Sequence, residues 1–244
     1  MKKILPWLLL LTLLYAKPKM AIVVDDCGYS LSDAKTLAAI KQPLTFAVIP
    51  GQAYSRASAQ VFGAAKRHAV LIHFPWTPLG KNGRSAYPVR IEPGYSAAAI
   101  QEMLDKALES VPNAAGVNNH QGSILSANQD MMDKFMGVLR GQSREFYFLD
   151  SATTVNSRAY ATARKQGLSA ARNDIFLDGV QTEEYITRRF AEAVAVAKQK
   201  GSVVVICHGN RPATKRVLKK LLLKYNAQID FVLLPEIIKL REQK

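Results

Sequence analysis

Short apolar runs alternate with amphipathic stretches along most of the chain. The clearest runs lie at residues 20–24, 44–50, 69–74, 145–151 and 202–208. Largely apolar runs of this length are typical of parallel strands that are covered on both faces. Between them, residues 96–111 carry Ile100, Leu104 and Leu108 at helical spacing, and Ser96 is the expected cap. The pattern therefore predicts strands and helices in regular alternation.

This alternation continues to the end of the chain and amounts to seven or eight βα units without a compositional break. A length of 244 residues is compatible with one large α/β domain. We therefore expect a single α/β domain, either a barrel or an open doubly wound sheet. No G-x-G-x-x-G or G-x-x-x-x-G-K-[ST] sequence follows the first predicted strand, which counts against a dinucleotide or nucleoside triphosphate site.

The first 16 residues have the layout of an export signal. Two lysines precede an apolar stretch, and Ala16 closes it before polar sequence begins. The stretch is shorter than the roughly 20 apolar residues of a transmembrane helix. We predict a signal peptide at residues 1–16, or an N-terminal anchor, because Leu14 makes an imperfect cleavage site. The domain at residues 17–244 is then exported to the periplasm, or stays on the outer face of the inner membrane if the leader is uncleaved.

Lysine and arginine outnumber aspartate and glutamate by 33 to 19, which gives a formal net charge of +14. This excess favours anionic partners in general. One dense basic run, Lys215 to Lys224, also has apolar residues at helical spacing and is interpreted as a helix of the domain with a solvated basic face. The export signal argues against nucleic acid as a partner, whereas peripheral or anchored association with a membrane stays open.

Residues capable of chemistry lie at the C-terminal ends of the predicted strands. They are Asp25 and Asp26, His73, Asn119 and His120, Asp150, and His208. In a parallel βα architecture the C-terminal ends of the strands lie on one face, so these residues are expected to become neighbours. The fourth histidine, His68, ends a helix instead and is expected only to favour the helix dipole.

One carboxylate and two neutral imidazoles suit a divalent metal, most simply zinc, with one position left open for water. His73 and His120 are the expected nitrogen ligands, and one of the two aspartates supplies the oxygen. The second aspartate can then act as a general base. His208, which is not bound to the metal in this scheme, can protonate a leaving group.

The chain has two cysteines, which excludes a disulfide-scaffolded small protein and a cysteine-rich zinc site. Cys27 follows the acid pair and Cys207 precedes His208, so both belong near the expected site. Two interpretations stay open. The thiols pair in an oxidising compartment, or they are two unrelated small buried residues.

Several short motifs occur in an order that resembles a known family. They are VVDDCG, LIHFPW, GVNNHQGS, FLDSATT, RNDIFLD and ICHG. This order is similar to that of the divergent polysaccharide deacetylase family, a branch of the NodB-like carbohydrate deacetylases, from about Met20 to Ile237. The resemblance implies a single-domain, distorted (β/α) barrel of seven or eight units. It also implies a metal bound by an aspartate and two histidines, and hydrolysis of N-acetyl groups on a glycan.

Matched motif by motif, the resemblance implies separate roles for the acids and histidines. Asp25 matches the catalytic base, and Asp26 matches the metal ligand. His73 matches the first histidine of the superfamily's H-x-x-x-H motif, but Thr77 stands where the second histidine would be. The histidine of the NNHQGS turn, His120, is implied as the replacement ligand.

The resemblance also implies an acid and its supporting residues. His208 matches the late-strand histidine that acts as the acid, with Asp150 implied as the residue that orients it. The superfamily's arginine that pairs with the base is absent from the turn, and Arg172 is its implied substitute and a candidate contact to the substrate. Gly209 follows His208, where the family tends to have proline.

Residues 75–95 form the longest irregular segment and are expected to face the substrate. Trp76, Tyr87 and Tyr95, in or beside it, either stack on sugar rings or pack against the barrel. Asn119 is a further candidate contact. The expected function is zinc-dependent removal of N-acetyl groups from an envelope polysaccharide. The alternative is an inactive protein of the same fold that binds an envelope glycan or a protein partner.

Overall fold

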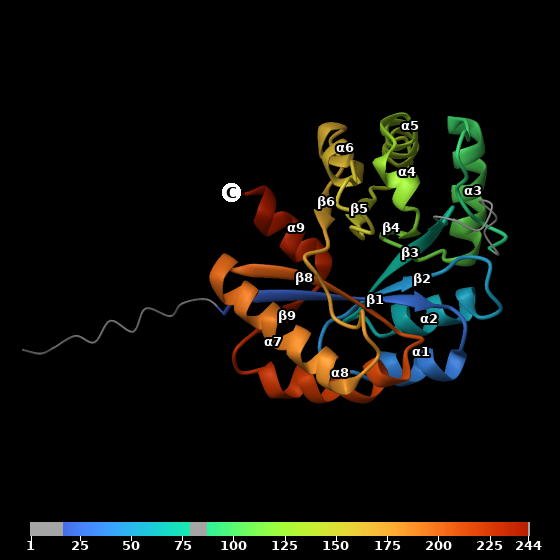
Figure 1. Cartoon of the computed structure of the whole chain (residues 1–244). Helices are drawn as coiled ribbons and strands as arrows, with labels where there is room; N and C mark the ends of the chain where they lie inside the picture. Colours follow the sequence, from blue (N-terminus) through green and yellow to red (C-terminus); the bar gives the residue numbers. More distant parts are fainter. Residues whose placement is uncertain (1–16, 79–86, 244) are drawn as a thin grey trace, which may run out of the picture.

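The structure, a computed structural model, describes residues 17–78 and 87–243. Within these residues, parallel strands form one curled sheet (Figure 1). The strands are β1 (Lys19–Cys27), β2 (Thr45–Val48), β3 (Ala69–Trp76), β4 (Gly116–Gln121), β5 (Tyr147–Asp150), β6 (Ala170–Arg172), β7 (Ile175–Phe176), β8 (Ser202–His208) and β9 (Asp230–Val232).

Helices alternate with most of the strands. They are α1 (Leu31–Ala38), α2 (Ser55–Ala64), α3 (Ala97–Ser110), α4 (Ser123–Ala127), α5 (Gln129–Arg140), α6 (Ala159–Lys165), α7 (Glu183–Lys200), α8 (Pro212–Tyr225) and α9 (Leu234–Glu242). As predicted, the Ser96 side chain caps α3 by accepting a hydrogen bond from Ala99 N–H. Gly201 ends α7 in the left-handed conformation that glycine adopts at low cost.

The sheet forms a half-barrel. Its strand order is β6-β5-β4-β3-β2-β1-β8-β7, and β9 pairs with β1 beside this path. No pairing joins the outer strands β6 and β7 to each other in the described part of the chain. The expected α/β fold, a distorted (β/α) barrel, is therefore confirmed, and the gap between these two strands is its distortion.

Alternation along the strands divides the core into two apolar layers. In β1, Ala21 and Val23 belong to a concave layer inside the half-barrel, and Ile22 and Val24 belong to an outer layer beneath the helices. α9 contributes Ile238 and its neighbours to the concave layer, so it fills the inside of the half-barrel. Polar residues lie beyond these layers, at the C-terminal ends of the strands.

The predicted strands recur with small changes at their ends. β1 runs to Cys27, past both aspartates, and the two-residue β7 was too short to stand out in the sequence. The predicted leader, residues 1–16, lies outside the described residues. None of the helices described is long and apolar enough to cross a membrane. Cys27 and Cys207 are both buried free thiols.

Candidate functional site

The two adjacent aspartates of β1 both face the site because the strand is irregular there. In a regular strand, Asp25 and Asp26 would point to opposite faces of the sheet. The register of β1 against β2 shifts between Val24 and Cys27, and Asp26 has a φ of 58°. Aspartate tolerates this left-handed conformation better than most residues. The Nε2 atom of His73 consequently lies 3.5 Å from Asp25 Oδ2 and 3.4 Å from Asp26 Oδ1.

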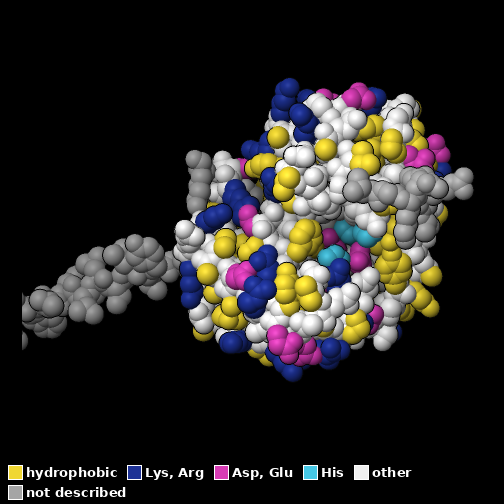
Figure 2. All heavy atoms as spheres, in the orientation of Figure 1, with side chains coloured by type: hydrophobic (Ala, Val, Ile, Leu, Met, Phe, Trp, Pro, Cys, Tyr) yellow, Lys and Arg dark blue, Asp and Glu magenta, His cyan; other side chains and the backbone are white. Residues whose placement is uncertain are grey.

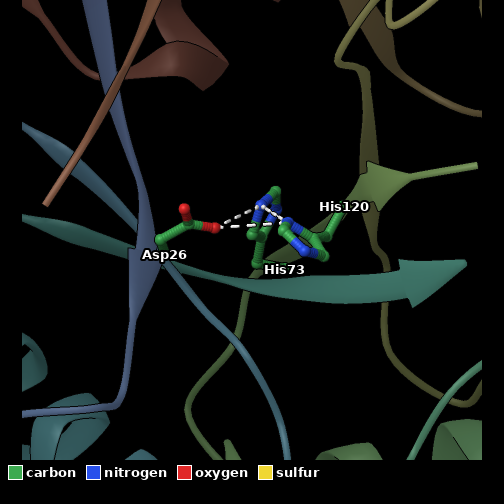
Figure 3. Close-up of side chains that lie close together, drawn as sticks. All are labelled: Asp26, His73 and His120. Carbon is green, nitrogen blue, oxygen red and sulfur yellow. Dashed lines mark hydrogen bonds and ion pairs between the residues drawn. The ribbon is translucent and has the colours of Figure 1, made fainter. Parts of the chain in front are cut away.

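Asp26, His73 and His120 converge on one point from β1, β3 and β4 (Figure 3). The Nδ1 atom of His120 lies 3.2 Å from Asp26 Oδ1 and 3.0 Å from His73 Nε2. One ligand atom from each residue lies within 4.8 Å of the other two. Figure 2 shows histidine and acidic side chains inside a hollow on this face of the molecule. The structure therefore contains a candidate metal site at the strand ends.

The carboxylate of Asp26 fits a metal ligand. Its Oδ2 accepts a hydrogen bond from Asn210 Nδ2 at 3.2 Å. Its Oδ1 is buried and has no hydrogen-bond partner among the described residues. An anionic oxygen without a donor, beside two imidazole nitrogens, matches the oxygen and nitrogen donor set of catalytic zinc sites. The three side chains accordingly fit a divalent metal with a further position open.

Asn118 connects the candidate metal site to Asp25. Its Nδ2 donates hydrogen bonds to Asp25 Oδ1 at 2.9 Å and to Ser151 Oγ at 3.2 Å. Its Oδ1 lies 2.9 Å from His73 Nδ1. Because a carbonyl oxygen can only accept, His73 must carry its proton on Nδ1, which leaves the Nε2 lone pair for a metal. One side chain thus holds both the carboxylate and the tautomer of the imidazole.

Tyr87 plays a similar role for His120. The hydroxyl of Tyr87 lies 3.1 Å from His120 Nε2, and the Tyr29 hydroxyl lies 3.0 Å beyond it. Burial lowers the pKa of His120, which favours the neutral imidazole that a metal requires. With Nδ1 turned to the metal position, the remaining proton sits on Nε2 and is donated to Tyr87. Tyr95, by contrast, packs against the core.

The two aspartates differ in proton affinity. Burial raises the pKa of Asp25, against the opposing charges of His73 and His208. Burial would also raise the pKa of Asp26, but the adjacent imidazoles of His120 and His73 outweigh it and hold this pKa well below the usual range. An ionised Asp26 suits a metal ligand, whereas an aspartate with a raised pKa is better matched to accepting a proton.

His208 is oriented by Asp178, and this corrects the expectation that Asp150 orients it. The Nδ1 atom of His208 lies 2.8 Å from Asp178 Oδ1, and Asp178 Oδ2 accepts the His208 backbone N–H at 2.8 Å. The Thr214 hydroxyl donates a further hydrogen bond of 2.6 Å to Asp178. Burial alone would lower the pKa of His208, but the hydrogen bond and charge of Asp178 raise it above its usual value.

Asp150 and Arg172 point away from the site. Each follows a residue of the concave layer, so strand alternation turns both side chains to the helix side of the sheet. Asp150 is buried, accepts a hydrogen bond of 2.8 Å from Ala152 N–H, and lies 3.9 Å from Arg172 Nε. Arg172 is therefore not the partner of Asp25, contrary to expectation. Asn118 occupies that place.

Trp76 and Asn119 are buried and structural, which corrects two expected substrate contacts. The Trp76 side chain has no exposed surface and meets the edge of Phe135, with ring centroids 5.1 Å apart. It therefore cannot stack on a sugar. Asn119 accepts a hydrogen bond from Ser151 N–H and donates one to the Gln121 carbonyl, each of 2.9 Å. The first bond ties the end of β4 to the residue after β5, and the second is local to the end of β4.

Sequence comparison identifies the family. The model of the family described as divergent polysaccharide deacetylase matches residues 22–238. The chain belongs to this family. It is 35% identical over 215 residues to the uncharacterized protein YibQ of Escherichia coli, a match that covers 88% of this chain and 65% of that relative. The chain therefore spans slightly less than two thirds of the length of YibQ.

Solved structures show the same deacetylase fold. An uncharacterized protein from Agrobacterium tumefaciens has a TM-score of 0.80 at 21% identity, over 91% of this chain and 89% of that one. The catalytic domain of a peptidoglycan N-acetylglucosamine deacetylase from Eubacterium rectale has a TM-score of 0.51 at 13% identity, over 90% of each chain. At these identities the likeness establishes the fold alone.

The sequence pattern did not identify two residues of the candidate site. Asn118 lies two positions before His120 on the same strand and hence on the same face, a spacing that could have identified it. Asp178 follows the apolar residues 175–177, but so short a run does not stand out as a strand. Asp150, at the end of a longer and clearer strand, was the more visible acid.

Proposed function

We propose that this protein is a zinc-dependent hydrolase that removes N-acetyl groups from a polysaccharide outside the cytoplasm. The observation that carries the proposal is the placement of Asp25 and His208 beside the Asp26, His73 and His120 cluster. Asp25 and His208 are register partners on the neighbouring strands β1 and β8. A base and an acid therefore lie next to a candidate metal site, which is the set of groups that amide hydrolysis needs.

Zinc held by Asp26, His73 and His120 would lower the pKa of a water molecule and polarise the acetamide carbonyl. Asp25 accepts the proton of the attacking water, and Asn118 holds its carboxylate in place. His208 donates a proton to the departing amine as the C–N bond breaks, while Asp178 keeps its ring oriented. Water and the acetamide are consumed, and acetate and a free amino sugar are released.

The substrate class follows from the family and the export signal. The family is described as divergent polysaccharide deacetylase, and the structural neighbour from Eubacterium rectale acts on peptidoglycan N-acetylglucosamine. The apolar N-terminal stretch supports export to the compartment where such glycans occur. We therefore expect an N-acetylated glycan of the cell envelope as the substrate. Tyr29, which is 40% exposed beside Tyr87, is available to a sugar ring.

The test is acetate release by the purified full chain from peptidoglycan and from N-acetylglucosamine polymers, with zinc and after chelation. We expect zinc to restore activity to the chelated protein. Asp25→Asn should lower kcat by about 10²–10⁴-fold and leave zinc stoichiometry unchanged. Asp130→Asn, on the exposed face of α5, is the matched control. If the zinc-loaded wild type releases no acetate from any of these glycans, the proposal fails and the inactive glycan-binding alternative stands.

A further inference from the structure

The outer face of α8 carries a stripe of cations with one leucine among them. The stripe consists of Arg216, Lys219, Lys220, Leu223 and Lys224, at relative positions 0, 3, 4, 7 and 8 of one helical face. All five side chains are exposed, and Leu223 is 59% exposed. The opposite face of α8 is buried in the outer core layer. The stripe is therefore a surface that the fold does not use.

Its positive charge is poorly balanced. α8 contains no acidic residue. No acidic side chain in the described ranges lies within 4.0 Å of the ammonium groups of Lys219, Lys220 or Lys224. Arg216 pairs with Glu183, which also interacts with Lys220, and Glu183 is the acid that offsets the stripe. Exposed helices commonly place an acid four positions from a lysine, as Asp130 and Lys134 do in α5.

The chain enters the domain at the end of this stripe. The Nζ atom of Lys17 donates a hydrogen bond of 3.4 Å to the carbonyl of Asn226, the residue that follows α8. The apolar stretch of the leader ends at Leu14. Three residues span at most about 10 Å. A membrane that held an uncleaved leader would therefore lie within reach of the Lys224 end of α8.

We propose that the α8 stripe binds the surface of a membrane that contains anionic phospholipid. Clustered lysines are attracted to such a surface, and an exposed leucine between them can enter the boundary between headgroups and acyl chains. Lys19 and Asp25 lie at opposite ends of β1, about 20 Å apart at strand spacing. Docking through α8 and Lys17 therefore holds the domain at the bilayer while the candidate metal site stays at the far end of the strands.

The experiment measures how the full chain partitions onto vesicles of phosphatidylcholine alone and onto vesicles in which a third of the lipid is phosphatidylglycerol. The wild type should bind the anionic vesicles more tightly. In the triple variant Lys219→Glu, Lys220→Glu and Lys224→Glu, the ratio of binding to anionic over neutral vesicles should fall by more than about tenfold. The control variant Lys66→Glu, Lys106→Glu and Lys165→Glu makes the same charge change outside α8. It should keep the wild-type preference for anionic vesicles. Equal losses in the two triple variants would overturn the proposal.

A second variant separates lipid from other polyanions. Leu223→Ser should weaken binding to the anionic vesicles and leave elution from a heparin column unchanged, because heparin offers charge without an apolar layer. If Leu223→Ser binds the vesicles as tightly as the wild type, the stripe is a general polyanion surface and the membrane assignment is wrong. Circular dichroism checks that each variant is folded, and acetate release is not needed for any of these readings.

Discussion

Asn118 donates a hydrogen bond of 2.9 Å to Asp25 although 93 residues separate them in the chain. The same amide accepts from His73 through its oxygen, so one buried side chain decides where a carboxylate and an imidazole point. The resemblance to the deacetylases implied an arginine-like partner for Asp25. An amide performs that role here and adds control over the tautomer of His73, which an arginine, having no acceptor, could not provide.

Replacing Asn118 should therefore weaken zinc binding as well as catalysis. We expect Asn118→Ala to lower zinc affinity by about 10–100-fold. The variant lacks the acceptor that holds the proton of His73 on Nδ1 and so leaves the Nε2 lone pair for the metal. Chelator competition measures this affinity. Asn113→Ala, which removes a side-chain hydrogen bond to the Ala59 carbonyl far from the candidate site, is the control. Unchanged zinc affinity in Asn118→Ala would contradict the tautomer argument.

Asp178 and Asp150 should behave differently when each is changed to asparagine. Asp178→Asn removes the charge that orients His208, so we expect kcat to fall by at least about tenfold while zinc stoichiometry stays at the wild-type value. Asp150→Asn should leave kcat nearly unchanged, because Asp150 faces the helix side of the sheet. Steady-state acetate release measures both. A large loss in Asp150→Asn alone would restore the original assignment.

The activity should fall on the alkaline side as His208 loses its proton. The raised pKa of His208 keeps the acid form to a higher pH than an ordinary histidine, whose pKa is about 6.5. Asp178→Asn should move the alkaline limb of kcat to lower pH. Because folding raises the pKa of His208, the protonated side chain also contributes to the stability of the folded state. This contribution is fully present below about pH 6.5 and is lost as the pH rises through the pKa of folded His208. An alkaline limb that does not move in Asp178→Asn would assign the acid to another group.

Tyr87 should tune the metal site through His120. Tyr87→Phe removes the hydroxyl that accepts the Nε2 proton of His120, and we expect zinc affinity to fall by about tenfold. Tyr54→Phe, at an exposed tyrosine before α2, serves as the matched control and should bind zinc as the wild type does. If both variants bind zinc equally well, the contact between Tyr87 and His120 has no role in metal binding.

Trp76 should matter for stability rather than for substrate. Trp76→Ala leaves a cavity beside Phe135, and we expect the free energy of unfolding to fall by about 3–5 kcal/mol. Urea denaturation measures the change. Tyr29→Ala, at a 40% exposed side chain, should cost far less stability. Loss of glycan binding in Trp76→Ala at wild-type stability would mean that the indole reaches the substrate after all.

Local sequence determined the fold class and the location of the chemistry. Each long apolar run predicted a strand, and the acids and histidines at the ends of these strands were placed correctly at the C-terminal end of the half-barrel. The strands could be predicted because a strand that is buried on both faces consists mainly of apolar residues. It was enough to bring His73, His120 and one of the two aspartates together, since parallel strands carry their ends to one face. The choice of Asp26 came from the family resemblance, and the structure places Asp26 in the candidate metal site.

Tertiary structure decided which side chains meet. A regular strand would have sent Asp25 and Asp26 to opposite faces, and only the register shift and the left-handed backbone of Asp26 turn both inward. Asp178 reaches His208 because β7 pairs with β8, whereas the more conspicuous Asp150 sits on the outward position of its strand. Local periodicity encodes burial, but strand neighbours, bulges and the face of a strand's last residue are set by packing between segments far apart in the chain.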